Sequence, residues 1–243
     1  MRASYTDFIR GDTTPFVCLL QDFFFQRPIR SHIDTAESSL EIAIEFLWVE
    51  QRQCATQVHL VVDSTKIQGA GLNGFIDMLV GNSLRKCDAP NPILVMELKN
   101  ISLLGLWKAK QAYPTANPRS QNQYKNLLND LRKATEENLL DFSYSFYDKD
   151  SRQWVTKQVR EVFQEAIVQL DKYTTLLSLG QGELPRAGRQ GRNGIVHDKV
   201  SCLDGGQDVL WGFVIICVGG ARVICRRVAV VQTQYTYIVK LKA

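Results

Sequence analysis

Two charged residues close an apolar segment near the centre of the chain. Residues 91–100 have the sequence NPILVMELKN, an almost unbroken apolar run that ends in Glu97 and Lys99. Such a run is typical of a strand buried on both faces. Residues two apart on a strand point to the same face, so the carboxylate and the ammonium group would lie side by side, with Leu98 on the other face. Taken alone, the pair is explained most simply as an ion pair where the strand meets solvent.

A third charged residue changes this interpretation. Asp77 interrupts a second apolar segment, residues 74–80, which lies just upstream. Alone, Asp77 also fits a structural role, as the polar residue of a strand end. If the two strands are neighbours, Asp77 and Glu97 converge, and two carboxylates that repel each other imply a bound cation. Because ligands that are all oxygen atoms favour Mg²⁺ or Mn²⁺ over zinc, the pattern predicts a site for one of these two ions.

Further along the chain, Gln169 and Tyr173 lie four residues apart in the segment QLDKY. On a helix this spacing places both side chains on one face. Tyr173 taken alone is explained more simply as a core residue. Together the two residues predict a polar pair on one side of a helix.

Hydrophobic periodicity predicts a mixed α/β order of elements around these residues. The pattern indicates helices at 34–53, near 121–135 and at 154–179, and strands at 58–62, 74–80, 91–100, 142–147, 209–218, 222–231 and 235–241. Val155 begins the apolar stripe of the third helix, and Gly219 and Gly220 predict a tight hairpin turn. The Gly- and Arg-rich residues 183–194 favour a mobile loop. This order predicts one α/β domain over residues 1–243, with a core of about 34–241, an insertion at about 101–153 and a central mixed β-sheet flanked by helices.

Composition indicates the class of protein but identifies no binding partner. The chain has 243 residues, 45% of them hydrophobic and 22% charged, with a formal net charge of +4. These values are ordinary for a globular protein. Six cysteines without a C-x-x-C pair indicate neither a disulfide framework nor a zinc site. No segment reaches the roughly 18 apolar residues that a membrane helix needs, so we expect an intracellular protein, nuclear or cytoplasmic, without a membrane partner. Basic residues gather at 108–133 and at 186–192. Two interpretations fit these clusters: solvated surfaces of loops and helices, or surfaces that contact phosphate groups.

In their order along the chain, these motifs resemble the PD-(D/E)XK nuclease superfamily. A helix with a glutamate is followed by a strand with Asp77, a strand with Glu97-x-Lys99 and a helix with Gln169-x-x-x-Tyr173. The chain is most similar to the exonuclease-like subtype, whose last core helix carries a Q-L-x-x-Y motif. A fainter similarity is to crinkler-type effector proteins, some of which carry such domains.

The resemblance covers residues 34–180, and the chain departs from the family pattern in two places. Ile76 stands where the family often has proline, and the segment between the second strand motif and the last helix is long. The glutamate of the first helix is Glu37, Glu41 or Glu45, and Glu41 is preferred because it lies between core residues.

The resemblance implies a restriction-endonuclease-like core and a metal-dependent nuclease that hydrolyses phosphodiester bonds. By this resemblance, Asp77 and Glu97 of this chain would hold Mg²⁺ or Mn²⁺, and the backbone carbonyl of Leu98 would be a further ligand. Lys99 would orient the attacking water and stabilise the developing charge. The substrate would be nucleic acid, with DNA favoured over RNA.

Two further side chains have implied roles. Gln169 would reach the water or a nucleotide, and Glu41 would complete a second ion site.

Two other functions fit the same residues. One is a nuclease-fold module that binds nucleic acid or a protein partner without cleaving. The other is an interaction domain in which the motifs occur by chance, and this would be favoured if Asp77 and Glu97 were far apart. Because both carboxylates and Lys99 are present, the enzyme is the preferred hypothesis.

Overall fold

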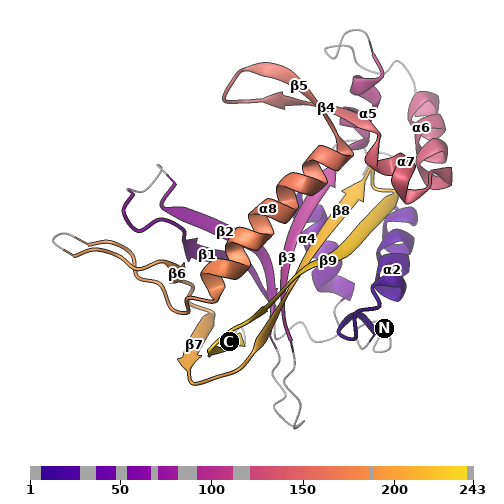
Figure 1. The fold of residues 1–243 in the computed structure, drawn as a ribbon. Helices are drawn as coiled ribbons and strands as arrows, with labels where there is room; N and C mark the ends of the chain where they lie inside the picture. The colour runs from indigo at the N-terminus through magenta and orange to yellow at the C-terminus, as the bar shows by residue number, and fades with distance from the viewer. Residues whose placement is uncertain are drawn as a thin grey trace. The chain divides into compact units, whose positions relative to one another are not determined.

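The computed structural model describes residues 7–27, 37–47, 54–66, 71–81, 92–111, 121–186 and 189–239, and the helices and strands below are those of this part of the chain. Figure 1 shows them as a ribbon. In chain order they are α2 (Thr14–Phe25), α4 (Glu37–Leu47), β1 (Cys54–Val61), β2 (Asn73–Val80), β3 (Ile93–Ile101), α5 (Leu103–Ala109), α6 (Gln121–Lys133), α7 (Glu136–Leu140), β4 (Ser143–Asp148), β5 (Gln153–Gln158), α8 (Val159–Leu177), β6 (Gly194–Ile195), β7 (Val200–Asp204), β8 (Val209–Val218), β9 (Arg222–Gln232) and β10 (Tyr235–Val239). The α/β class predicted from the sequence is confirmed.

The chain divides into two compact units. The first comprises Met1–Leu47, Leu98–Ala166 and Ile215–Cys225, and the second comprises Trp48–Glu97, Ile167–Val214 and Arg226–Ala243. The division passes along the chain within β3, α8, β8 and β9. The prediction of a single domain stays a prediction.

A mixed six-stranded sheet is the centre of the fold, as predicted. Its strand order is β6-β1-β2-β3-β8-β9, and each of these strands has residues in the second unit. β1, β2 and β3 are successive antiparallel strands, and the short β6 pairs antiparallel with β1. Six consecutive residues of β3, Ile93 to Leu98, are buried. The unbroken apolar run therefore does form a strand covered on both faces.

Within the second unit, the C-terminal half of α8 packs closely on the sheet. Gly74 of β2 faces Tyr173, and a Cβ atom added at Gly74 would lie 2.9 Å from the tyrosine Cε1. At Gly212 of β8 the corresponding atom would lie 3.1 Å from a methyl carbon of Leu170. Two glycines on the sheet thus allow the helix to approach the backbone. Leu170 and Leu177 are fully buried, as expected for the apolar stripe.

The first unit gathers α2, α4, α5, α6 and α7 with the hairpin of β4 and β5. Arg222, where β9 begins, donates hydrogen bonds to the carbonyls of Leu131, Arg132 and Ala134 at the end of α6. These contacts satisfy carbonyl groups that the helix leaves without an intrahelical partner. The side chain of Gln21 in α2 accepts a hydrogen bond of 3.3 Å from the Val223 backbone. Polar contacts therefore connect two helices of this unit to the start of β9.

The prediction of a helix over 154–179 is wrong at its start. Residues 153–158 form β5, which pairs with β4, and α8 begins only at Val159. Val155 and Thr156 are β-branched and favour a strand, and Trp154 stacks edge-on against Tyr147 across the hairpin at a ring-centroid distance of 5.8 Å. Pairing with β4 therefore outweighs the helical periodicity that the sequence shows here.

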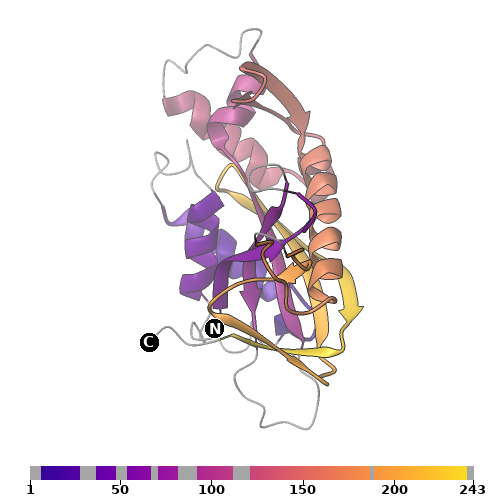
Figure 2. The same cartoon turned by 90° about the vertical axis from the view of Figure 1, so that its left-hand side faces the viewer.

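Residues 183–194 also differ from the prediction, because in the described part they form a paired ribbon and not a loop. Glu183 is paired with Arg192 and Arg186 with Arg189. The last strand, β10, pairs with β7 in a separate two-stranded sheet, and the two run side by side in both ribbon views (Figures 1 and 2). The sequence had indicated no strand at β7.

No helix in the described part of the chain combines the length and the apolar character that crossing a lipid bilayer requires.

Candidate active site

The pairing of β2 with β3 brings the strand of Asp77 beside the strand of Glu97. The antiparallel register aligns Val80 with Leu94, Leu79 with Val95 and Met78 with Met96. Continued by one pair, this register would set Asp77 against Glu97, and directly opposed residues have Cβ atoms about 4.5–5.5 Å apart on the same face of a sheet. Both carboxylates also raise the pKa of Tyr173. The two residues that the sequence singled out therefore lie in the same region of the second unit.

The surroundings of the two carboxylates differ. Glu97 has no exposed surface, whereas Asp77 is half-buried between the buried residues Ile76 and Met78. A fully buried glutamate is rare, because removing its charge from water is costly without compensation. Leu98, the predicted carbonyl ligand, is 1% exposed.

Lys99 lies two residues beyond Glu97 on β3, in the first unit. Strand alternation directs its side chain to the face that Glu97 occupies. The ammonium nitrogen is 3.6 Å from a carboxylate oxygen of Glu37, at the first residue of α4. The Glu37 side chain is half exposed, so this ion pair adds little stability. Glu41, the residue that the sequence favours as the family glutamate of this helix, lies one turn later on the same helix face and is half-buried.

Tyr144 on β4 shares the surroundings of Lys99 in the first unit. Burial, followed by the charges of Glu165 and Glu37, raises the pKa of the phenol to about 12, while the charge of Lys99 acts to lower it. This tyrosine had been predicted only as part of a strand. Its place beside Lys99 depends on pairing between distant segments, and nothing in the local sequence indicates it.

Gln169 and Tyr173 form the predicted polar pair on α8, in the second unit. The side-chain amide of Gln169 donates a hydrogen bond of 3.2 Å to the Tyr173 hydroxyl. Burial raises the pKa of Tyr173, the hydrogen bond from Gln169 lowers it, and the charges of Glu97 and Asp77 both raise it. The two carboxylates therefore act on one phenol that Gln169 also contacts. Gln169 itself is half-buried.

One residue of this region has no signal in the sequence. Gln57 of β1 lies opposite Asp77, since the β1–β2 register pairs Thr56 with Met78 and Val58 with Ile76. Its backbone has a φ of 51°, in the left-handed region that few residues other than glycine adopt. Strained residues of this kind gather at functional sites. Glutamine carries no sequence signal for such a backbone.

The donor set of the paired carboxylates fits a small divalent cation. Mg²⁺ usually keeps several waters and binds proteins through one or two carboxylates, as Asp77 and Glu97 would provide. Among the described residues no three His, Cys, Asp or Glu side chains gather into a metal cage.

A scan against protein-family models finds no match for the chain, and comparisons with the curated proteins and with solved structures find none either.

Proposed function

We propose that the protein is a metal-dependent nuclease with a restriction-endonuclease-like core of the PD-(D/E)XK kind. The observation that carries the proposal is the pairing of β2 with β3, whose register, continued by one pair, would oppose Asp77 to Glu97, with Lys99 two residues further along β3. The element order supports it as well: α4 precedes three antiparallel strands, and α8 precedes β8, the neighbour of β3 in the sheet.

In this proposal Asp77, Glu97 and the carbonyl of Leu98 hold Mg²⁺ or Mn²⁺. When bound, the ion would make water more acidic and neutralise charge on the scissile phosphate. Lys99 orients the attacking water and stabilises the charge that develops in the transition state. Gln169, held by Tyr173, positions the water or a nucleotide. The substrate is nucleic acid, with DNA favoured, and the protein acts inside the cell.

Cleavage of labelled DNA and RNA by the purified protein tests this proposal. We expect cleavage in Mg²⁺ or Mn²⁺ and its loss with EDTA. Lys99→Ala should slow cleavage by a factor of about 10²–10³, the range found when one group that stabilises the transition state is removed. Lys110→Ala is the matched control, because Lys110 forms an exposed ion pair with Asp130 at 3.8 Å. Equal cleavage by both variants would place the activity elsewhere.

A second function has one observation in its favour. Lys99 pairs with Glu37, so its side chain has a partner within the fold that requires no role in cleavage. The protein would then be a nuclease-fold module that binds nucleic acid or a protein partner without cleaving. Salt-sensitive binding of nucleic acid, with no cleavage in either metal, would support this alternative.

A further inference from the structure

A narrow two-stranded ribbon leaves the edge of the sheet in the second unit. Residues 181–186 and 189–195 form this segment, which we call the arginine ribbon. Glu183 and Arg192 exchange two backbone hydrogen bonds of 2.8 and 2.9 Å, and Arg186 and Arg189 exchange two of 3.2 and 2.9 Å. A Cβ atom added at Gly191 would lie 2.5 Å from the Glu183 carbonyl oxygen. The two strands are therefore closely packed through their backbones.

The base of the arginine ribbon is fixed to β1 by several contacts. Ile195 pairs with Leu60, and the next backbone N–H, of Val196, donates a hydrogen bond of 2.9 Å to the carbonyl of His59. The side chain of Asn193 accepts one of 2.8 Å from the backbone of Ser64. These bonds hold the orientation of the ribbon relative to the sheet.

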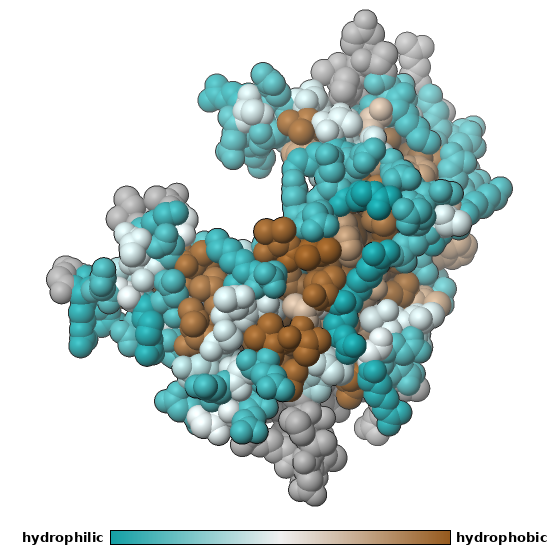
Figure 3. Space-filling view, viewed as in Figure 1, coloured by the Kyte–Doolittle hydropathy of each residue, from teal (hydrophilic) through white to brown (hydrophobic). Residues whose placement is uncertain are grey.

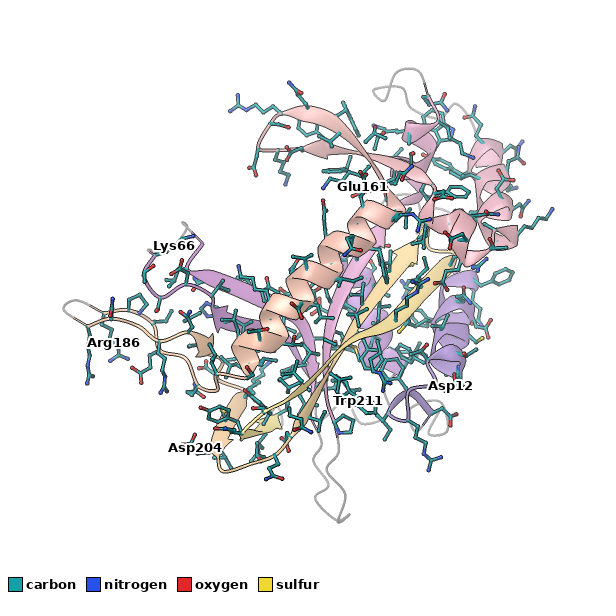
Figure 4. The ribbon with its side chains drawn as sticks, in the orientation of Figure 1. Asp12, Lys66, Glu161, Arg186, Asp204 and Trp211 are labelled. Carbon is teal, nitrogen blue, oxygen red and sulfur yellow. The ribbon has the colours of Figure 1, made fainter. Side chains whose placement is uncertain are left out.

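The arginine ribbon carries a concentrated positive charge. Arg186, Arg189 and Arg192 are exposed, and the segment has one acidic residue, Glu183, whose carboxylate lies 4.0 Å from Arg192. The outer part of the ribbon is hydrophilic in Figure 3, and Figure 4 shows Arg186 on it, away from the sheet. Arg186 and Arg189 face each other across the strands, where like charges are destabilising. A bound polyanion would relieve this repulsion.

The ribbon also starts close to the paired carboxylates. β6 neighbours β1, β1 neighbours β2, and β2 carries Asp77. Adjacent strands lie about 4.8 Å apart, so the base of the ribbon is about 10 Å from the strand of Asp77. The ribbon and the carboxylates therefore belong to the same edge of the sheet in the second unit.

We propose that the arginine ribbon enters the major groove of double-stranded DNA and holds the duplex at the carboxylate pair. The inference rests on the proposed function and names its substrate class. The major groove of B-DNA is about 12 Å wide and admits a two-stranded ribbon, whereas the major groove of A-form RNA is deep and narrow. Arginine suits this position because its planar donors bind phosphates and guanine edges in pairs.

Binding of fluorescent oligonucleotides by the full chain in EDTA tests the inference without cleavage. The probes are a 20-base-pair DNA duplex, the RNA duplex of the same sequence and one of the DNA strands. The variant Arg186→Gln/Arg189→Gln removes both opposed charges and leaves the Glu183–Arg192 pair. Its control is Lys149→Gln/Arg152→Gln, which removes two exposed positive charges from the β4–β5 hairpin. Each variant is measured at several salt concentrations.

We expect the ribbon variant to bind duplex DNA at least tenfold more weakly at moderate salt, while the control binds it like the wild type. The dependence of log K on log salt should become shallower, its slope smaller in magnitude by about 1.8. This is about 0.9 for each phosphate that an arginine no longer neutralises. An unchanged affinity for duplex DNA, or an equal decrease for the single strand and for the RNA duplex, would overturn the inference. So would binding of polyglutamate in place of duplex DNA, which would indicate an acidic protein partner.

The inference and the proposed function fail in different ways. If the ribbon variant loses duplex binding but the wild type cleaves nothing, the nuclease proposal fails and the ribbon proposal stands. If the wild type cleaves DNA and the ribbon variant binds and cleaves duplex DNA equally well, only the ribbon proposal fails.

Discussion

In the proposed site, the convergence of Asp77 and Glu97 depends on the register of β2 and β3. A slip of one residue in this pairing would turn every side chain of a strand to the other face, and the two carboxylates would separate. The neighbouring pairs, Met78 with Met96 and Leu79 with Val95, are all fully buried. A slip would give these closely packed side chains new partners, so their packing favours the observed register.

Gly74 tests how closely α8 approaches β2. In Gly74→Ala the new Cβ would lie 2.7 Å from a Val62 methyl carbon and 2.9 Å from the ring of Tyr173. We expect a loss of about 1–3 kcal/mol in the free energy of unfolding, measured by urea denaturation. The loss should shrink in a Tyr173→Ala background, because one of the two obstructing side chains is then gone. A fully additive double variant would show that the helix does not press on this glycine.

Gln57 tests whether the strained backbone beside Asp77 serves the site. Gln57→Gly should stabilise the fold by about 1 kcal/mol, because glycine adopts a positive φ without steric cost. The matched control is Arg152→Gly on the β4–β5 hairpin, where φ is 55°. We expect both variants to gain stability and only Gln57→Gly to lose cleavage activity. Equal activity in the two variants would mean that the strain at Gln57 has no part in the site.

At the scale of elements, the sequence predicted what local patterns determine. The buried run of β3, the hairpin at Gly219 and the apolar stripe of α8 all have local signals, and the structure contains each of them. The start of α8 was missed because residues 153–158 join β4, a contact that helical periodicity does not reveal. The strand β7 was missed for the same reason, since its partner β10 lies more than 30 residues away.

The residues of the candidate site likewise fall into those that the local sequence indicates and those that it does not. Asp77 and Glu97 are indicated by the sequence because each departs from the apolar pattern of its segment, and Gln169 and Tyr173 because they are four residues apart on a predicted helix. The pairing of Lys99 with Glu37, the place of Tyr144 and the left-handed Gln57 depend on distant partners. Propensity and spacing carry no information about such contacts.

The burial of β8 makes a prediction about alkaline pH. Cys217 is 1% exposed, and burial raises the pKa of its thiol from 9.0 to about 12. Below pH 9 the thiol is neutral in the folded and in the unfolded chain. Its contribution to the free energy of unfolding is therefore fully present there. As pH rises toward 12, only the unfolded chain loses this proton, and the free energy of unfolding falls by about 1.4 kcal/mol per pH unit for this group.

Urea denaturation at intervals between pH 8 and pH 11 measures this effect. Cys217→Ala should have a shallower dependence on pH than the wild type, whatever its stability at pH 8. Cys18→Ala is the control, because Cys18 is exposed. The same pH dependence in wild type and Cys217→Ala would show that this thiol ionises equally in both states.

For the whole molecule, a metal that binds only the folded state must raise its stability. At a concentration about 100 times its dissociation constant, the ion would add about 2.7 kcal/mol to the free energy of unfolding. We therefore expect Mn²⁺ to raise the thermal midpoint of the wild type, as followed by calorimetry. Asp77→Asn should abolish this rise and slightly stabilise the metal-free protein, because it removes one of the two like charges that act on Tyr173.

The control for that measurement is Asp171→Asn, an exposed aspartate on α8. It should keep the full response to Mn²⁺. A response that survives in Asp77→Asn would place the ion at another site.

The rate of DNA cleavage by the two carboxylate variants tests the central claim most directly. The claim is that Asp77 and Glu97 together hold the ion on which phosphodiester hydrolysis depends. We predict that the wild type and Asp171→Asn cleave a labelled duplex at the same rate in Mg²⁺, and that Asp77→Asn and Glu97→Gln each lose cleavage while remaining folded. Cleavage by either carboxylate variant at the wild-type rate would contradict the account, as would a folded wild type that cleaves neither DNA nor RNA in Mg²⁺ or Mn²⁺.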